Sequence, residues 1–222
     1  MKPYIFLHIP RTGGTSIADV LPAGRTTDAQ IKKAISSGQR IAHFSDSKFA
    51  TNKGISLHHA TLDEFQLSEN HFFTFAFVRN PWDRVVSIFE HQINNCEHLF
   101  PKADDNKINK FEFFIGLVKW LWEQDLLNYE LDGHLRPQTC YTHKNGEQIV
   151  DFYGRYENMT DDLKTLSKMC KFDLKNIEIP SINKSNNRLS EYKNYYYDGN
   201  GITKSVVSNL YRDEIEIYGY KF

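Results

Sequence analysis

The sequence predicts an α/β protein with a largely parallel sheet. Residues 5–9 and 72–78 are apolar runs that are too short for buried helices and suit buried strands. A turn and a helical pattern follow each run, and strands that alternate with helices favour parallel pairing. The chain has 222 residues and no Gly/Ser/Pro-rich linker or repeat, so we expect a single domain over residues 1–222.

Local signals define where several elements begin and end. Pro10 ends the first strand because it has no N–H to donate to a sheet. Thr61 and Glu64 have the spacing of a capping box, which predicts a helix start. Asn80 and Pro81 suit the N-cap and the first position of a helix over 82–94. The remaining predictions are helices over 28–37, 111–129, 161–170 and 203–218, strands over 40–44 and 55–59, and a hairpin turn at Asn145 and Gly146.

The turn after the first strand has the composition of an anion-binding loop. Gly13 and Gly14 allow positive φ and close approach of a ligand, and Thr15 and Ser16 follow where the unpaired N–H groups of the next helix begin. Such a helix start attracts anions. A Walker A loop would need glycine at Ile9 and lysine at Thr15, so ordinary ATP or GTP hydrolysis is disfavoured.

Composition excludes several other classes. The formal net charge of -1 argues against a general nucleic-acid binder. Cys96, Cys140 and Cys170 lack C-x-x-C spacing, so neither a disulfide framework nor a zinc site is indicated. The first strand begins close to Met1 and no apolar run approaches the ~20 residues of a membrane span. We therefore expect a cytoplasmic protein.

Two motifs together resemble those of one enzyme family. Residues 8–16, H-I-P-R-T-G-G-T-S, resemble the 5′-phosphosulfate loop of sulfotransferases that use 3′-phosphoadenosine 5′-phosphosulfate (PAPS), and they are most similar to the carbohydrate (Golgi-type and bacterial) branch. Residues 73–89, F-T-F-A-F-V-R-N-P-W-D-R-V-V-S-I-F, resemble the family's 3′-phosphate motif. Residues 135–138, residues 151–159 and the C-terminal end also match, so the resemblance covers nearly the whole chain.

The resemblance implies a fold and a set of nucleotide-binding residues. The implied fold is three-layer α/β/α with a central, mostly parallel sheet, like that of P-loop nucleotide kinases. The implied PAPS-binding residues are Arg11, Thr12, Gly13, Gly14, Thr15 and Ser16 at the phosphosulfate, Arg79 and Ser87 at the 3′-phosphate, and Lys184 and Arg188 in a basic loop. Arg11 stands where the family usually has lysine, so the cation is kept but its geometry changes. A simpler alternative is that Arg79 only pairs with Asp83, while Ser87 fills space in a crowded helix.

Histidine suits the role of base near neutral pH. His59 resembles the catalytic histidine that carbohydrate sulfotransferases place between the two motifs. His58 is the alternative, because neighbours on a strand point to opposite faces. His8 suits a buried, hydrogen-bonded position or a place beside the phosphosulfate. Arg11 would stabilise negative charge during transfer, and no metal is required by these residues.

The predicted reaction transfers a sulfuryl group from PAPS to a hydroxyl of a carbohydrate or glycoconjugate and releases adenosine 3′,5′-bisphosphate (PAP). Arg136 and Gln138 are the candidate substrate contacts. Trp120, Trp122 and the tyrosines at 195–197 could stack on sugar rings, but aromatic residues at helical spacing are usually core. The alternatives are a nucleotide or small-molecule kinase, which would need Mg²⁺ and ATP, and an inactive PAP- or glycan-binding module.

Overall fold

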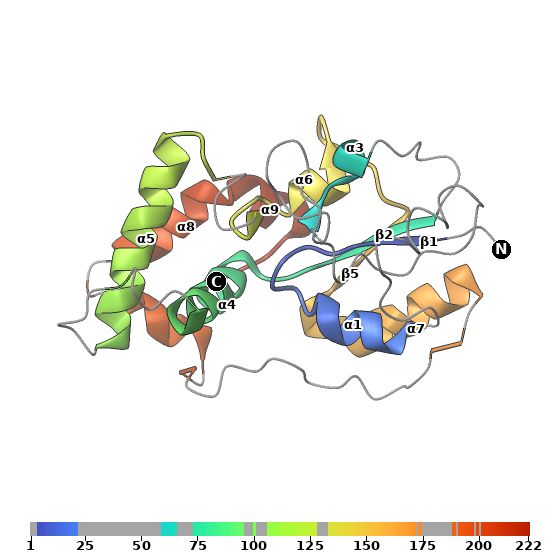
Figure 1. Ribbon diagram of the computed structural model, residues 1–222, viewed down its shortest axis with the longest axis horizontal. Helices are drawn as coiled ribbons and strands as arrows, with labels where there is room; N and C mark the ends of the chain where they lie inside the picture. The colour runs from blue at the N-terminus through green and yellow to red at the C-terminus, as the bar shows by residue number, and fades with distance from the viewer. Residues whose placement is uncertain are drawn as a thin grey trace. The chain divides into compact units, whose positions relative to one another are not determined.

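The computed structural model describes residues 4–21, 59–65, 73–95, 100, 106–127, 133–171, 173–174, 188–189, 191–197, 199 and 201–222. The chain divides into two compact units (Figure 1). Unit 1 is Met1–Val78 with Gln138–Ile182, and unit 2 is Arg79–Pro137 with Asn183–Phe222. The single domain expected over residues 1–222 stays a prediction.

Unit 1 contains a parallel sheet, as the alternation of strands and helices predicted. Its strands β1 (Tyr4–Leu7), β2 (Phe73–Val78) and β5 (Phe152–Arg155) lie in the order β1-β2-β5, with both pairs parallel. Gly154 pairs with Phe77, and a Cβ atom on Gly154 would lie 2.4 Å from Cε1 of that ring. The glycine therefore makes room for Phe77. The α/β class is confirmed, while the kinase-like three-layer form stays a prediction.

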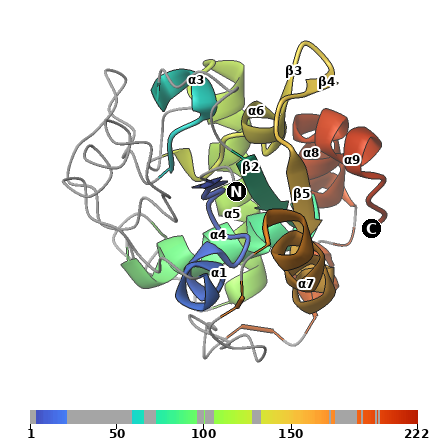
Figure 2. The same ribbon diagram turned by 90° about the vertical axis from the view of Figure 1, so that its right-hand side faces the viewer.

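Two helices of unit 1, α1 (Gly14–Val20) and α7 (Met159–Cys170), lie side by side along the sheet (Figures 1 and 2). The short 3-10 helix η5 (Tyr156–Asn158) leads into α7. Apolar side chains of both helices and of the strands form one buried cluster that includes Phe6, Ile17, Val20, Phe75, Leu163 and Leu166. This burial holds the turn between β1 and α1 against the sheet.

The remaining elements of unit 1 confirm two local predictions. Before α3 (Leu62–Phe65), the carboxylate of Glu64 accepts a hydrogen bond from the N–H of Thr61 at 2.9 Å, as in a capping box. After α6 (Thr139–Thr142), strands β3 (His143–Lys144) and β4 (Glu147–Gln148) form an antiparallel hairpin. Asn145 and Gly146 join them with φ of 54° and 82°, the pattern of a two-residue type I′ turn.

Unit 2 is helical where the structure describes it. Its elements are α4 (Pro81–Asn95), α5 (Lys107–Glu123), the 3-10 helix η6 (Tyr192–Tyr196), α8 (Ile202–Leu210) and α9 (Arg212–Tyr218). Oδ1 of Asn80 accepts from the N–H of Trp82 at 3.1 Å, so the predicted N-cap of α4 is confirmed.

Two predicted helices of unit 2 have different bounds. The helix expected over 111–129 is α5, which starts earlier because Oδ1 of Asn106 caps the N–H of Ile108 at 2.9 Å. It ends at Glu123, shortly before Asp125 takes a positive φ of 58°. The helix expected over 203–218 is interrupted at Tyr211, whose φ of -114° and ψ of 31° separate α8 from α9.

Aromatic side chains form the core of unit 2. Phe89 of α4 contacts the rings of Phe111 and Tyr195 at centroid distances of 5.3 and 6.0 Å. The expectation that aromatic residues are core is correct for Tyr195 and Tyr196. It is wrong for Tyr197, which is exposed, and for Trp120 and Trp122, which are 51% and 49% exposed. The two tryptophans are exposed because the buried stripe of α5 follows Phe111, Phe114, Val118 and Leu121.

Several predictions lie outside the described residues. They are the helix over 28–37, the strand over 40–44, most of the strand over 55–59, and the candidate residues His58 and Lys184. Among the helices that the structure does describe, none combines the length and apolarity needed to cross a bilayer.

Candidate functional site

The loop between β1 and α1 has an unusual backbone. Arg11 and Gly13 have positive φ values of 66° and 84°, while the intervening Thr12 does not. Alternating φ signs turn successive N–H groups towards one side and form an anion-binding concavity. The side chain of Thr12 is buried and donates to the main-chain oxygen of Ile9 at 2.9 Å, which closes the turn.

The sequence allows positive φ at both Gly13 and Gly14, and of the two the structure has it only at Gly13. The second left-handed position is Arg11, and Gly14 is the first residue of α1. Gly14 is required for a different reason, since a Cβ atom there would lie 2.0 Å from Cδ2 of His8. A left-handed arginine is unfavourable, and such conformations cluster at functional sites.

Two residues of the segment 151–159 pack against the loop. A Cβ atom on Gly13 would lie 2.5 Å from Cε of Met159 and 3.1 Å from Cδ2 of Tyr156. Asp151 at the other end of the segment accepts from the N–H of Thr74 at 2.7 Å. The resemblance to the family included this segment, but its packing against Gly13 could not be predicted, because a contact between distant residues leaves no local sequence signal.

The two histidines near the loop form a buried pair. His8 and His59 are 7% and 6% exposed, and their rings meet edge to face with centroids 5.2 Å apart. Nδ1 of His59 lies 3.3 Å from the main-chain oxygen of His8. A carbonyl oxygen can only accept, so Nδ1 is the donor in this contact and Nε2 is the nitrogen left as the candidate base. Tyr141 holds the main chain here by donating to the oxygen of His59 at 2.8 Å.

The predicted 3′-phosphate residues lie in unit 2 around one carboxylate. Nε and Nη2 of Arg79 contact Oδ2 of Asp83 at 2.8 and 2.7 Å, and Nη2 of Arg188 pairs with Oδ1 of the same side chain. Burial opposes ionisation of Asp83, but the two guanidinium groups outweigh it and lower its pKa. Ser87 is buried on α4, one turn beyond Asp83. The cluster holds two cations and one anion, so it keeps a net positive charge.

This cluster bears on the simpler alternative for Arg79. The pairing with Asp83 that this alternative assumed is present. It also recruits Arg188, which lies 105 positions from Asp83 in the sequence. Asp83 is not among the candidate residues predicted from the sequence, although its spacing of four from both Arg79 and Ser87 was a usable signal.

The candidate substrate residues Arg136 and Gln138 are buried, at 3% and 0% exposed. The fully buried Arg84 donates to the main-chain oxygens of His134 and Arg136, both at 2.8 Å. The oxygen of Gln138 accepts from the N–H of Tyr141 at 3.0 Å. These bonds hold the main chain of the segment, and contact of either side chain with substrate stays a prediction.

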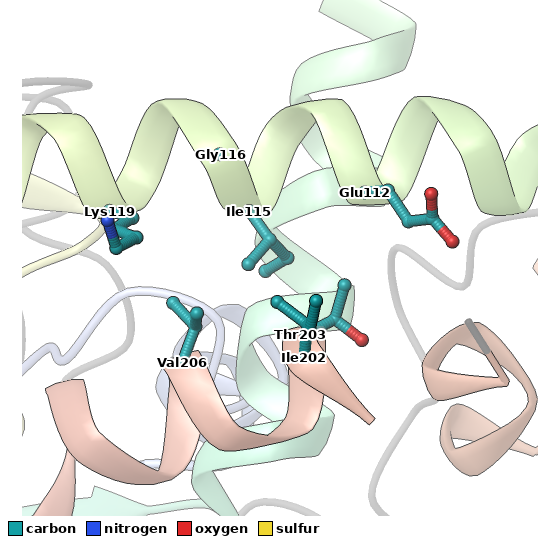
Figure 3. Close-up of a pocket in the computed structure, with 7 residues that line it drawn as sticks. All are labelled: Glu112, Ile115, Gly116, Lys119, Ile202, Thr203 and Val206. Carbon is teal, nitrogen blue, oxygen red and sulfur yellow. The ribbon is translucent and has the colours of Figure 1, made fainter. Parts of the chain in front are cut away.

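A cavity of about 190 Å³ lies between α5 and α8 in unit 2 (Figure 3). Ile115 of α5 and Val206 of α8 face each other across it, with Glu112 and Lys119 also on α5 (Figure 3). Its lining is largely apolar and includes none of the candidate residues named above. The chemistry of the candidate site therefore lies elsewhere.

The structure groups the candidate residues into two sets. Unit 1 holds His59, Gln138 and the loop from Arg11 to Ser16, and unit 2 holds Arg79, Ser87, Arg136 and Arg188. Within unit 1, the ring of His8 links the loop to the candidate base, since it packs against both Gly14 and His59.

Comparisons with known proteins identify a relative and a family for this chain. An "Uncharacterized protein" of Archaeoglobus fulgidus is 34% identical over 97 residues, which are 44% of this chain and 66% of that protein. The chain thus spans just under two thirds of this relative's length. No solved structure matches the chain. The sequence model of the sulfotransferase family matches residues 2–221. The chain therefore belongs to the sulfotransferase family.

Proposed function

We propose that this protein transfers a sulfuryl group from PAPS to a hydroxyl group of a carbohydrate or glycoconjugate and releases PAP. The observation that carries the proposal is the chain of contacts in unit 1 from Gly14 through the ring of His8 to His59. It joins the loop after β1 to a histidine whose Nδ1 faces a main-chain oxygen, which leaves Nε2 as the candidate base. A base beside such a loop suits group transfer from an anionic donor to a hydroxyl.

Each set of candidate residues has donors that suit one charged end of PAPS. The loop of residues 11–16 would hold the 5′-phosphosulfate with main-chain N–H groups, the hydroxyls of Thr15 and Ser16, and the guanidinium of Arg11. Arg79, Ser87 and Arg188 would hold the 3′-phosphate, since guanidinium groups and a hydroxyl suit a phosphate dianion. PAPS supplies the activated sulfuryl group.

In the proposed step, Nε2 of His59 takes the proton of the acceptor hydroxyl. The hydroxyl oxygen bonds to sulfur as the bond from sulfur to the 5′-phosphate oxygen breaks. Arg11 and the loop N–H groups stabilise the negative charge that grows on the leaving phosphate. The main-chain oxygen of His8 keeps the ring of His59 oriented throughout, because it holds Nδ1–H.

The test is transfer of labelled sulfate from PAPS to a panel of glycans and phenols, together with calorimetric titration of PAP. We expect His59→Ala to lower kcat by about 10²- to 10⁴-fold with PAP affinity kept. Ser87→Ala should instead weaken PAP binding by about 10- to 150-fold through loss of one hydrogen bond to a charged group. Arg11→Ala should reduce turnover more than PAP affinity.

His143→Ala is the matched control for loss of a histidine, since His143 lies on β3 and outside the proposed machinery. A parallel assay with ATP and Mg²⁺ tests whether the protein is instead a kinase. Absence of transfer to every acceptor, combined with no binding of PAP, would overturn the proposal. Binding of PAP without any transfer would favour an inactive binding module.

A further inference from the structure

The short segment Arg188–Leu189 is bonded to the rest of unit 2 at two points. The side chain of Arg188 pairs with Asp83 near the start of α4. The N–H of Leu189, the next residue, donates to Oη of Tyr195 at 2.9 Å. The side chain and the main chain of this segment therefore have separate anchors.

The second anchor continues to α4 through a buried hydroxyl. Oη of Tyr195 donates its one hydrogen to Oε1 of Glu90, and its lone pairs accept the N–H of Leu189. Burial, together with the neighbouring Glu90, raises the pKa of Tyr195, so the hydroxyl keeps the hydrogen that this arrangement needs. Glu90 is 1% exposed and pairs with Nζ of Lys107 at 2.9 Å, which compensates its buried charge.

Both anchors lie on the same face of α4 as Ser87. Asp83, Ser87 and Glu90 are separated by four and three residues, the spacing that places side chains above one another on a helix. Asp83 and Glu90 thus stand on either side of Ser87 along the helix. A segment tied to both of them keeps Arg188 at the end of this face where Arg79 also lies.

We propose that Tyr195 and Glu90 are positioning residues that hold Arg188 ready for the 3′-phosphate of the nucleotide. The proposal rests on the proposed function, in which Arg79, Ser87 and Arg188 bind that phosphate. A guanidinium that is already in place loses less conformational freedom on binding than one on an unanchored segment. The Tyr195 hydroxyl therefore raises affinity for the nucleotide without touching it.

The variant Tyr195→Phe tests this, because it removes one oxygen and keeps the ring that packs on Phe89 and Phe111. We expect calorimetry to show PAP binding weakened by about 3- to 10-fold, the loss expected for one net hydrogen bond, with kcat at saturating PAPS unchanged. Binding of adenosine 5′-phosphate, which lacks the 3′-phosphate, should not change. In an Arg188→Gln background, the same substitution should have no further effect on PAP affinity.

Tyr211→Phe is the matched control. This buried tyrosine of unit 2 donates to the main-chain oxygen of Leu135 at 2.8 Å, so its loss removes a comparable buried hydrogen bond outside the contacts of Arg188. It should leave PAP affinity unchanged.

Each contrary outcome has its own meaning. The proposal is overturned if Tyr195→Phe leaves PAP affinity unchanged, if it weakens both nucleotides equally, or if it still weakens PAP in the Arg188→Gln background. A wild-type protein that binds no PAP would overturn the proposed function itself, and the positioning role with it.

Discussion

Nδ1 of His59 lies 3.3 Å from the main-chain oxygen of His8, and the ring of His8 fills the space beside Gly14. His8 therefore orients the ring of His59 with its main-chain oxygen and packs against the loop with its own ring. The pair is separated by 51 positions in the sequence.

Gly14→Ala should lower the free energy of unfolding by about 1–3 kcal/mol, because its Cβ would lie 2.0 Å from the buried ring of His8. His8→Ala removes that ring, so the glycine substitution should cost much less in the His8→Ala background. Urea unfolding of the two single variants and the double variant measures this coupling. Simple additivity of the two effects would contradict the contact.

Because Arg11 is left-handed, glycine should be more stable than alanine at this position, the reverse of their order within a helix. Both Arg11→Gly and Arg11→Ala remove the cation, but only glycine adopts φ of 66° without steric cost. Arg11→Gly should therefore be about 1–2 kcal/mol more stable than Arg11→Ala in chemical denaturation. The same two substitutions at Lys119, within α5, should show the opposite order. Alanine more stable than glycine at both positions would contradict the loop geometry.

Alanine should change the stability of the protein with opposite signs at two glycines that have free space around them. Gly116 lies within α5 and a Cβ there meets nothing within 4 Å, so Gly116→Ala should stabilise the protein by about 0.5–1 kcal/mol. Gly201 is equally open but has φ of 70°, so Gly201→Ala should destabilise it by about 1–2 kcal/mol. Thermal or urea unfolding checks both values. Equal signs would be inconsistent with the described backbone.

The ion pairs of Asp83 predict a pH dependence of stability. Its folded pKa is below the ordinary 3.8, so this carboxylate stabilises the fold above that pH, and the contribution is lost as pH falls through the folded pKa. Asp83→Asn should lower the free energy of unfolding by roughly 1.5–3 kcal/mol at pH 7. The difference in free energy of unfolding between wild type and Asp83→Asn should narrow below about pH 3.8.

Asp63→Asn serves as the control for Asp83, since Asp63 is exposed and pairs with Lys144 on the surface. Its effect should stay below about 1 kcal/mol at all pH values. A gap between wild type and Asp83→Asn that is constant from pH 7 to pH 3 would argue against the two-arginine bridge.

Cys140 and Cys170 should differ in their reaction with iodoacetamide. Burial raises the pKa of the Cys170 thiol to about 11, with a further contribution from the charge of Asp151, whereas Cys140 is exposed. The thiolate is the reactive form, so at pH 7.5 Cys140 should be labelled well before Cys170 in the native protein. Peptide mass mapping distinguishes the sites, and labelling in urea gives the unprotected rate. Equal native rates would contradict the burial of Cys170.

Much of the local structure could be predicted because its signals lie within a few residues. The cap by Asn80, the bond from Thr61 to Glu64 and the turn at Asn145 depend on neighbours two to four positions away. The bounds of α5 were predicted less well. Asn106 is a suitable cap, but the apolar pattern that indicated the helix becomes clear only from Phe111.

The sequence by itself determined the α/β class, the strand-turn-helix at the start of the chain and the family motifs around Arg11, Arg79 and Ser87. Only the tertiary structure decided that Asp83 joins Arg79 to Arg188, that His8 lies between Gly14 and His59, and that Trp120 is exposed. The physical reason is sequence separation. A cap or a turn is determined by hydrogen bonds between close neighbours, whereas these contacts exist only once distant segments pack together.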